Sequence, residues 1–177
     1  ILREQLMILA IDIGNSNISI GIFQKTALTH SWRITSDLFK ETDEYSVLLS
    51  RLIAEVPSLN HPSRFHIVMC SVVPPLTDVV SQACSKLFNV EPLIIGRHIH
   101  PNISINYDVP KDVGTDRIVN ALAAHSIYGQ HNLIIVDLGT ATVFDAISKE
   151  GSYLGGAIAP GLALSSEALF LKASQIK

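Results

Sequence analysis

One short pattern occurs twice in this chain of 177 residues, and each copy lies between two stretches of strand character. Residues 11–17 read Ile-Asp-Ile-Gly-Asn-Ser-Asn, and residues 136–142 read Val-Asp-Leu-Gly-Thr-Ala-Thr. Both copies place an aspartate, an apolar residue and a glycine at the end of one strand and before the next, which is typical of a β-hairpin turn. Two equivalent hairpins 125 residues apart indicate two equivalent domains.

The residues around the first copy predict a β-β-β-α-β-α-β order. Apolar residues in runs or in alternation predict strands, and apolar residues at a spacing of three and four predict helices. Thr42 and Asp43 are start signals for the first helix, Pro57 is its stop signal, and Pro74-Pro75 precede the second. The expected strands are residues 7–13, 17–23, 28–34, 65–73 and 92–95, and the expected helices are residues 42–56 and 74–88.

A second unit is expected to begin near residue 112. Residues 115–128 have helical spacing and end at Gly129, and a buried strand at residues 133–136 leads into the second copy of the turn. We therefore predict an α/β protein with domains at residues 7–111 and 112–177, the second cut short within the helical stretch after Gly161. Residues 1–6 precede Met7 and are left out of the fold prediction.

Composition argues against several classes of function. The net charge of -3 and the pI near 6.1 provide no basic surface for nucleic acid or an anionic membrane. No apolar run approaches the roughly 18 residues of a membrane span. Cys70 and Cys84 form no CxxC pair, so we expect reduced core cysteines, a cytoplasmic protein and small-molecule chemistry.

The two turns have the composition of a phosphate site. A carboxylate beside converging backbone N–H groups suits a magnesium-bound phosphate, and Gly14 and Gly139 permit a close backbone approach. The chain has no Gly-Lys dipeptide and no Gly-x-Gly, which argues against a P-loop and a dinucleotide fingerprint. One copy alone favours an ordinary β-hairpin; two matching copies favour a nucleotide held between two domains.

The helix at residue 115 begins with a second candidate group, Gly114-Thr115-Asp116-Arg117. A first-turn aspartate is kept ionised by the helix dipole, so Asp116 suits an acceptor for a hydroxyl proton. Arg117 suits a phosphate or a substrate carboxylate. The alternative is that Asp116 only stabilises the helix, as acidic residues in first turns commonly do.

Seven segments together resemble one family. They are residues 12–17, 32–37, 43–45, 107–110, 114–121, 137–142 and 155–161. In this order they resemble type III pantothenate kinase, a member of the acetate and sugar kinase, Hsp70 and actin superfamily. The resemblance implies two actin-like (ribonuclease H-like) domains with mixed sheets, the second incomplete in this chain. It also implies phosphorylation of pantothenate by ATP with Mg²⁺ and a monovalent cation, K⁺ or NH₄⁺, in a homodimer.

The resemblance also assigns roles to individual residues. Asp116 is implied to be the catalytic proton acceptor, and Asp137 to bind the monovalent cation. Asp12 is implied to hold Mg²⁺ through a phosphate or water, and Ser16 stands where threonine is common. The implied substrate-binding residues are Tyr107, Gly114, Thr115, Asp116 and Arg117, and the implied ATP-binding residues are Asp12, Ile13, Gly14, Asn15, Ser16, Asn17, Ile18, Ser19 and Thr140. A further substrate-contacting threonine and part of the subunit interface are expected beyond Lys177.

Two other functions remain open from sequence. One is a different small-molecule kinase of the same superfamily, because the turns specify phosphates and not the acceptor. The other is a non-enzymatic transcription accessory factor, which the absence of a basic stripe disfavours. Trp32 and Tyr45 are interpreted as core or near-core residues, and the scattered histidines as structural or surface residues.

Overall fold

A computed structural model describes residues 7–56 and 65–172 of the chain. Residues 1–6 and Pro57, which entered the sequence predictions, lie outside the described residues. The chain divides into two compact units, residues 1–100 and residues 101–177, and each is described by itself below.

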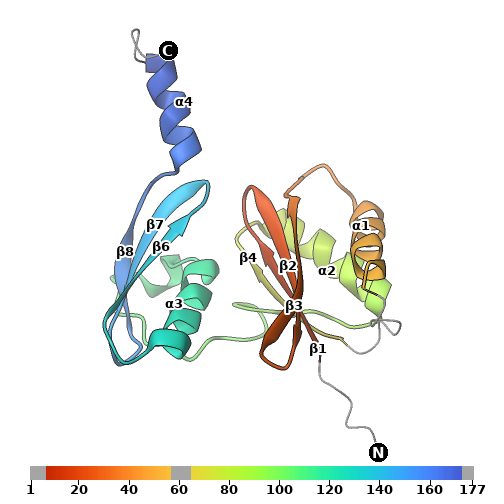
Figure 1. The fold of residues 1–177 in the computed structure, drawn as a ribbon, viewed down its shortest axis with the longest axis horizontal. Coiled ribbons are helices and arrows are strands. Elements are labelled where there is room, and N and C mark those ends of the chain that lie inside the picture. The colour runs from red at the N-terminus through yellow and green to blue at the C-terminus, as the bar shows by residue number, and fades with distance from the viewer. Residues whose placement is uncertain (1–6, 57–64, 173–177) are drawn as a thin grey trace, which may run out of the picture. The chain divides into compact units, whose positions relative to one another are not determined.

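Unit 1 has the predicted order of elements around a five-stranded mixed sheet (Figure 1). Its elements are β1 (Met7–Ile13), β2 (Asn17–Gln24), β3 (Ala27–Thr35), α1 (Thr42–Ala54), β4 (Phe65–Ser71), α2 (Pro74–Phe88) and β5 (Leu93–Ile94). The sheet order is β3-β2-β1-β4-β5. Strands β1, β2 and β3 pair antiparallel, whereas β4 pairs parallel to both β1 and β5.

One face of this sheet makes the core of unit 1. Alternation along β1 and β2 puts six aliphatic side chains on that face, each at most 2% exposed, and residues of α1 and α2 pack over them. These side chains are Leu9, Ile11, Ile13, Ile18, Ile20 and Ile22. Tyr45 of α1 belongs to the same core, and Trp32 packs at its edge, which confirms both interpretations.

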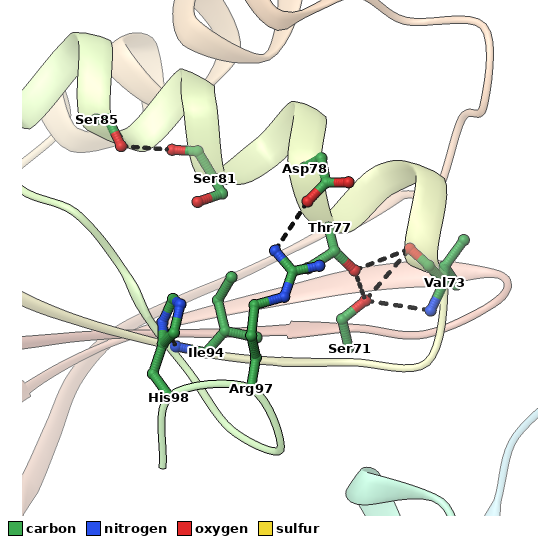
Figure 2. Close-up of polar contacts among 9 residues, drawn as sticks. All are labelled: Ser71, Val73, Thr77, Asp78, Ser81, Ser85, Ile94, Arg97 and His98. Carbon is green, nitrogen blue, oxygen red and sulfur yellow. Dashed lines mark hydrogen bonds and ion pairs between the residues drawn. The ribbon is translucent and has the colours of Figure 1, made fainter.

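Hydroxyl groups fasten the start of α2 to the end of β4 (Figure 2). The Ser71 hydroxyl accepts hydrogen bonds from the Val73 amide at 3.1 Å and from the Thr77 hydroxyl at 2.7 Å. Nearby, His98 Nδ1 accepts a hydrogen bond from the Ile94 amide at 3.2 Å, so this histidine has a structural role. These contacts satisfy backbone groups at the ends of α2 and β5 that would otherwise lack partners.

Unit 2 holds a three-stranded antiparallel sheet, ordered β6-β7-β8, and two α-helices among its described residues. Its elements are η3 (Pro110–Asp112), α3 (Thr115–Tyr128), β6 (Leu133–Leu138), β7 (Ala141–Ile147), β8 (Tyr153–Pro160) and α4 (Leu162–Lys172). Helix α3 packs on one face of the sheet in a small core that includes Ala121, Ile147 and Tyr153. The other face is apolar but exposed.

The segment before α3 belongs to unit 2, although composition placed residues 101–111 in the first domain. Ile105 forms a parallel bridge with Tyr153 of β8. The Asn106 amide donates to the Tyr153 carbonyl, and the Tyr153 amide donates to the Ser104 carbonyl, both at 2.8 Å. Backbone pairing with a strand so far along the chain leaves no local signal, so the sequence alone could not assign these residues to unit 2.

Two further observations bear on the sequence predictions. Cys70 and Cys84 are both buried in unit 1 as reduced cysteines, as predicted. Among the described helices, none has the length and apolar character needed to cross a membrane.

Candidate functional site

The first predicted turn closes β1 onto β2 and is held from behind by Ser36. The Gly14 amide donates to the Asn17 carbonyl at 2.9 Å, which leaves Asn15 and Ser16 exposed at the tip. Ser36, just after β3, donates its amide to the Ser16 carbonyl at 3.0 Å and its hydroxyl to the Gly14 carbonyl at 2.6 Å. The tip is therefore fixed by two hydrogen bonds on the side opposite its exposed groups.

Polar side chains follow this turn on the face of the sheet away from the core. The strand register aligns Asp12 with Ser19 and Ser19 with Arg33, so the three lie in one row across β1, β2 and β3. They line a shallow, open pocket of about 500 Å³. An aspartate, a hydroxyl and a guanidinium beside a turn with exposed tip residues suit a phosphate and its cation.

The second predicted turn closes β6 onto β7 with one residue fewer. The Gly139 amide donates to the Ala141 carbonyl at 2.9 Å, and Leu138 pairs with Thr142. Gly161, just after β8, donates its amide to the Thr140 carbonyl at 3.0 Å. A Cβ on Gly161 would lie 2.4 Å from the carbonyl oxygens of both Gly139 and Thr140, so only glycine fits behind this turn. Thr140 is exposed at its tip.

The first turn of α3 presents the predicted catalytic aspartate. Gly114 is the N-cap residue, and the Asp116 carboxylate folds over it and accepts a hydrogen bond from the Arg117 amide at 2.8 Å. A Cβ on Gly114 would lie 2.5 Å from Asp116 Oδ1, so glycine makes room for the carboxylate. Asp116 therefore stabilises the helix start and remains partly exposed, and the two interpretations of this residue are compatible.

Arg117 points into a buried polar cluster with two residues that sequence reasoning missed, Asp145 and Tyr153. Arg117 Nε donates to Asp145 Oδ1 at 2.9 Å, Arg117 Nη2 lies 2.7 Å from the same oxygen, and the Tyr153 hydroxyl donates to it at 2.7 Å. Burial by itself lowers the pKa of Arg117, but the hydrogen bond and charge of Asp145 outweigh it and raise that pKa. Burial, and then the Asp145 hydrogen bond, raise the pKa of Tyr153 above its usual range.

Tyr107 lies beside this cluster and is 41% exposed. Its ring edge would be 3.3 Å from a Cβ on Gly155, which has a φ of +119°. A positive φ and a close aromatic neighbour both favour glycine at this position. Gly155 thus shapes the surface on which Tyr107 packs.

The structure gathers the predicted substrate residues of unit 2 but leaves the two turns in separate units. Residues 114–117 share the first turn of α3, and Tyr107 lies near Arg117. Asp137 pairs with Val143 and so shares the α3 face with Asp145; diagonal neighbours of this kind lie about 7–8 Å apart. The sequence did contain one sign of Asp145: it is a charged residue two positions before Ile147, on the same buried face of β7.

Each of the two turns has one carboxylate as an oxygen donor for a cation. No cluster of three or more His, Cys, Asp or Glu side chains occurs among the described residues. Mg²⁺ in phosphate-transfer sites is commonly held by one or two carboxylates together with the phosphates and water, and Asp12 beside its turn can supply such a carboxylate. Asp137, exposed at the end of β6, can supply another to a hard monovalent cation.

Comparisons with known proteins agree on one family. The family model described as type III pantothenate kinase matches residues 8–177. The curated type III pantothenate kinase of Geotalea daltonii is 47% identical over 172 residues, which cover 96% of this chain and 66% of that protein. Those of Pelobacter propionicus and Syntrophus aciditrophicus are 48% and 44% identical at the same coverage. The chain thus spans 66% of the length of these relatives.

Solved structures share the fold at low sequence identity. The type II variant of the Aquifex aeolicus Ppx/GppA phosphatase matches with a TM-score of 0.57 and 13% identity, covering 93% of this chain and 55% of that one. The ethanolamine utilization protein EutJ of Carboxydothermus hydrogenoformans matches with a TM-score of 0.53 and 17% identity, covering 97% of this chain and 61% of that one. These matches, with the repeated meander, confirm the predicted actin-like α/β fold.

Proposed function

The chain belongs to the type III pantothenate kinase family, and on that premise we propose that the protein transfers a phosphoryl group from ATP to pantothenate, the first step of coenzyme A biosynthesis. The observation that carries this proposal is the first turn of α3. There the partly exposed Asp116 carboxylate and the anchored Arg117 guanidinium follow each other directly. This pairing supplies a proton acceptor and an anion-binding group for a substrate that has a hydroxyl and a carboxylate.

The roles of the side chains follow from their chemistry. Asp116 accepts the proton as the pantothenate hydroxyl attacks the γ-phosphate, while Arg117 and Tyr107 hold the rest of the substrate. The turn at residues 12–19 and Thr140 bind the phosphates of ATP through backbone N–H and hydroxyl groups. The protein mainly positions the reactants, because phosphoryl transfer needs little covalent help from side chains.

The cations belong to the same proposal. Mg²⁺, near Asp12, and K⁺ or NH₄⁺, near Asp137, supply positive charge that neutralises the phosphates. The finer expectations of a cytoplasmic homodimer that does not bind nucleic acid also belong here. Light scattering during gel filtration tests the oligomeric state, and binding to DNA at low salt tests the accessory-factor alternative.

An assay of the full-length protein with ATP and pantothenate tests the function. We expect activity that depends on K⁺ or NH₄⁺, and an Asp116→Asn variant whose kcat falls by about 10²–10⁴-fold, the usual contribution of a general base. Asp112→Asn, an exposed aspartate in η3, is the matched control and should retain full activity. Wild-type turnover in Asp116→Asn, or preference for another hydroxyl substrate in a panel, would overturn the assignment.

A further inference from the structure

Asp145 is the one charged side chain that lies in the core of unit 2 among the described residues, and it is only 1% exposed. It sits in the middle of β7 on the face that α3 covers. A buried carboxylate is costly unless it is paired and hydrogen-bonded. Its Oδ1 accepts hydrogen bonds from Arg117 Nε and from the Tyr153 hydroxyl, and these two bonds compensate for its burial.

This arrangement uses only one edge of the Arg117 guanidinium. The edge formed by Nε and Nη2 faces Asp145 Oδ1 at 2.9 and 2.7 Å. The Tyr153 ring lies against the guanidinium, with its centroid 5.7 Å from Cζ. The Arg117 side chain is 12% exposed; Nε makes the hydrogen bond to Asp145, whereas the buried Nη2 contacts the same carboxylate as an ion pair but has no hydrogen-bond partner among the described residues. The guanidinium is therefore anchored through Nε, and its remaining N–H groups form a free edge that can receive a ligand.

The neighbouring strand is also shaped around this pair. Gly156 of β8 pairs with Asp145, and a Cβ there would lie 2.0 Å from the Phe144 carbonyl oxygen, 2.6 Å from Arg117 Nη2 and 2.7 Å from Asp145 Oδ1. A side chain at this position would clash first with the β7 backbone and would also displace the ion pair. Three elements, α3, β7 and β8, therefore converge on one orientation of the guanidinium.

We propose that Asp145, with Tyr153, is a positioning residue that holds Arg117 so that its free edge receives the carboxylate of the substrate. This inference rests on the proposed function of Arg117 in substrate binding. Asp145 does not touch the substrate; it acts through Arg117. Its role is orientation rather than charge, because its own negative charge opposes the binding of an anion.

Steady-state kinetics of the full-length protein test this role. We expect Asp145→Ala to raise the KM for pantothenate by about 10–100-fold, the cost of misplacing a binding group by about an ångström, with the KM for ATP changed less than about twofold. Asp145→Asn keeps an oxygen acceptor and Tyr153→Phe removes one hydrogen bond, so both should show smaller increases. Glu150→Gln, which changes an exposed carboxylate in the middle of the β7–β8 connection, is the control.

A double-mutant cycle separates positioning from general stabilisation. If Asp145 acts only through Arg117, then Asp145→Ala made in an Arg117→Ala protein should change the KM for pantothenate by less than about twofold. The Arg117 Nε–H signal in the nitrogen–proton NMR spectrum should be protected in wild type, weakened in Tyr153→Phe and lost in Asp145→Ala. Tyr153→Phe and Asp145→Asn still decide the question if Asp145→Ala fails to fold.

The outcomes separate this inference from the proposed function. A wild-type protein that does not phosphorylate pantothenate overturns both. If the wild type is active, two results would each overturn the positioning role alone. One is an unchanged KM for pantothenate in Asp145→Asn and Tyr153→Phe. The other is that Asp145→Ala raises the KM for pantothenate equally with and without Arg117→Ala. A selective rise in the KM for pantothenate that disappears without Arg117 supports it.

Discussion

Units 1 and 2 both contain a three-stranded antiparallel meander with the same Asp-apolar-Gly turn, yet they support that turn in different ways. Behind the first turn, Ser36 adds a hydroxyl bond to the Gly14 carbonyl. Behind the second, at the corresponding place after the third strand, Gly161 fits because it has no side chain. The repeated Asp-apolar-Gly pattern therefore determines the backbone conformation of each turn. The contacts that stabilise each turn depend on residues outside the pattern.

The two sheets also differ in what covers the equivalent face. Leu9, Ile11 and Ile13 of β1 are at most 2% exposed beneath α1 and α2. The residues 125 positions later, Ile134, Val136 and Leu138, are 50–69% exposed in β6. All described residues of α4 are exposed as well. The same apolar pattern is thus a core in unit 1 and a bare surface in unit 2.

The largest expected effect is on stability, and it should differ between the buried face of β1 and the exposed face of β6. Leu9→Ala removes a fully buried side chain and should lower the free energy of unfolding of unit 1 by about 2–5 kcal/mol. Ile134→Ala, at the matching position in unit 2, should change stability by no more than about 0.5 kcal/mol in this chain. Urea unfolding followed by Trp32 fluorescence and by circular dichroism measures both, because the chain has a single tryptophan and it lies in unit 1.

An equal loss in both variants would contradict the comparison, since it would mean that the β6 face is covered in solution. The loss in Leu9→Ala should appear in the tryptophan signal. Ile134→Ala should leave that signal unchanged.

A second prediction concerns the support of the second turn. Gly161→Ala would bring a methyl group within 2.4 Å of two backbone carbonyl oxygens, and backbone cannot move aside as a side chain can. We expect a loss of about 1–3 kcal/mol in the stability of unit 2, as for other overpacking substitutions. Thermal unfolding followed by circular dichroism measures this loss.

Gly139→Ala is the matched control for that experiment. It lies in the same turn, but its Cβ would be 3.8 Å from the nearest neighbour, the Ala141 carbonyl oxygen, which is an ordinary contact. Comparable losses in the two variants would show that the turn is sensitive to any substitution and would refute the specific role of Gly161.

A third prediction concerns the first turn, where the support is a hydrogen bond. Ser36→Ala deletes the hydroxyl that donates to the Gly14 carbonyl but keeps the amide bond to the Ser16 carbonyl. The expected loss is about 0.5–1.5 kcal/mol, the net value of one hydrogen bond. Ser50→Ala is the control, because its hydroxyl bonds a helix carbonyl at an exposed position. A loss no larger than that of the control would show that the hydroxyl does not support the turn.

Much of the fold could be predicted because its signals are local. Alternation identified β1 and β2, helical spacing identified α1 and α3, and the repeated turn identified the duplication. The shared order of family motifs then singled out Asp116 and Arg117 as candidate substrate residues, and their roles stay predictions. The secondary-structure inferences need only residues within one element, and the duplication and the motif order need only a comparison of short segments along the chain.

The missed features all depend on distant parts of the chain. Asp145 and Tyr153 lie 28 and 36 residues after Arg117, and they meet it only because α3 packs on the β7–β8 hairpin. The pairing of residues 104–106 with Tyr153 was hidden for the same reason. Ser36 and Gly161 were visible as residues of family motifs, but their contacts with the turns require the third strand of each meander to be in place.

The smallest expected effect is a pH dependence of stability that occurs in unit 1 and not in unit 2. Burial raises the pKa of Cys84, in the core of unit 1, from an ordinary value of 9.0 to about 12. The unfolded thiol therefore loses its proton near pH 9.0 while the folded thiol keeps it, so the free energy of unfolding of unit 1 must fall as the pH rises through that value. Between about pH 7.5 and about pH 9.5 the loss should be less than about 1 kcal/mol.

The unfolding of the wild type and of Cys84→Ala, followed by Trp32 fluorescence at each pH, isolates this contribution. The difference in stability between the two proteins should shrink as the pH rises, because the variant has no thiol to ionise and all other groups cancel. Unit 2 contains no cysteine among residues 101–177, so its unfolding should show no such difference. A pH-independent difference in unit 1 would mean that the thiol already meets solvent in the folded state, and the core that distinguishes unit 1 would then be looser around α2 than its buried side chains indicate.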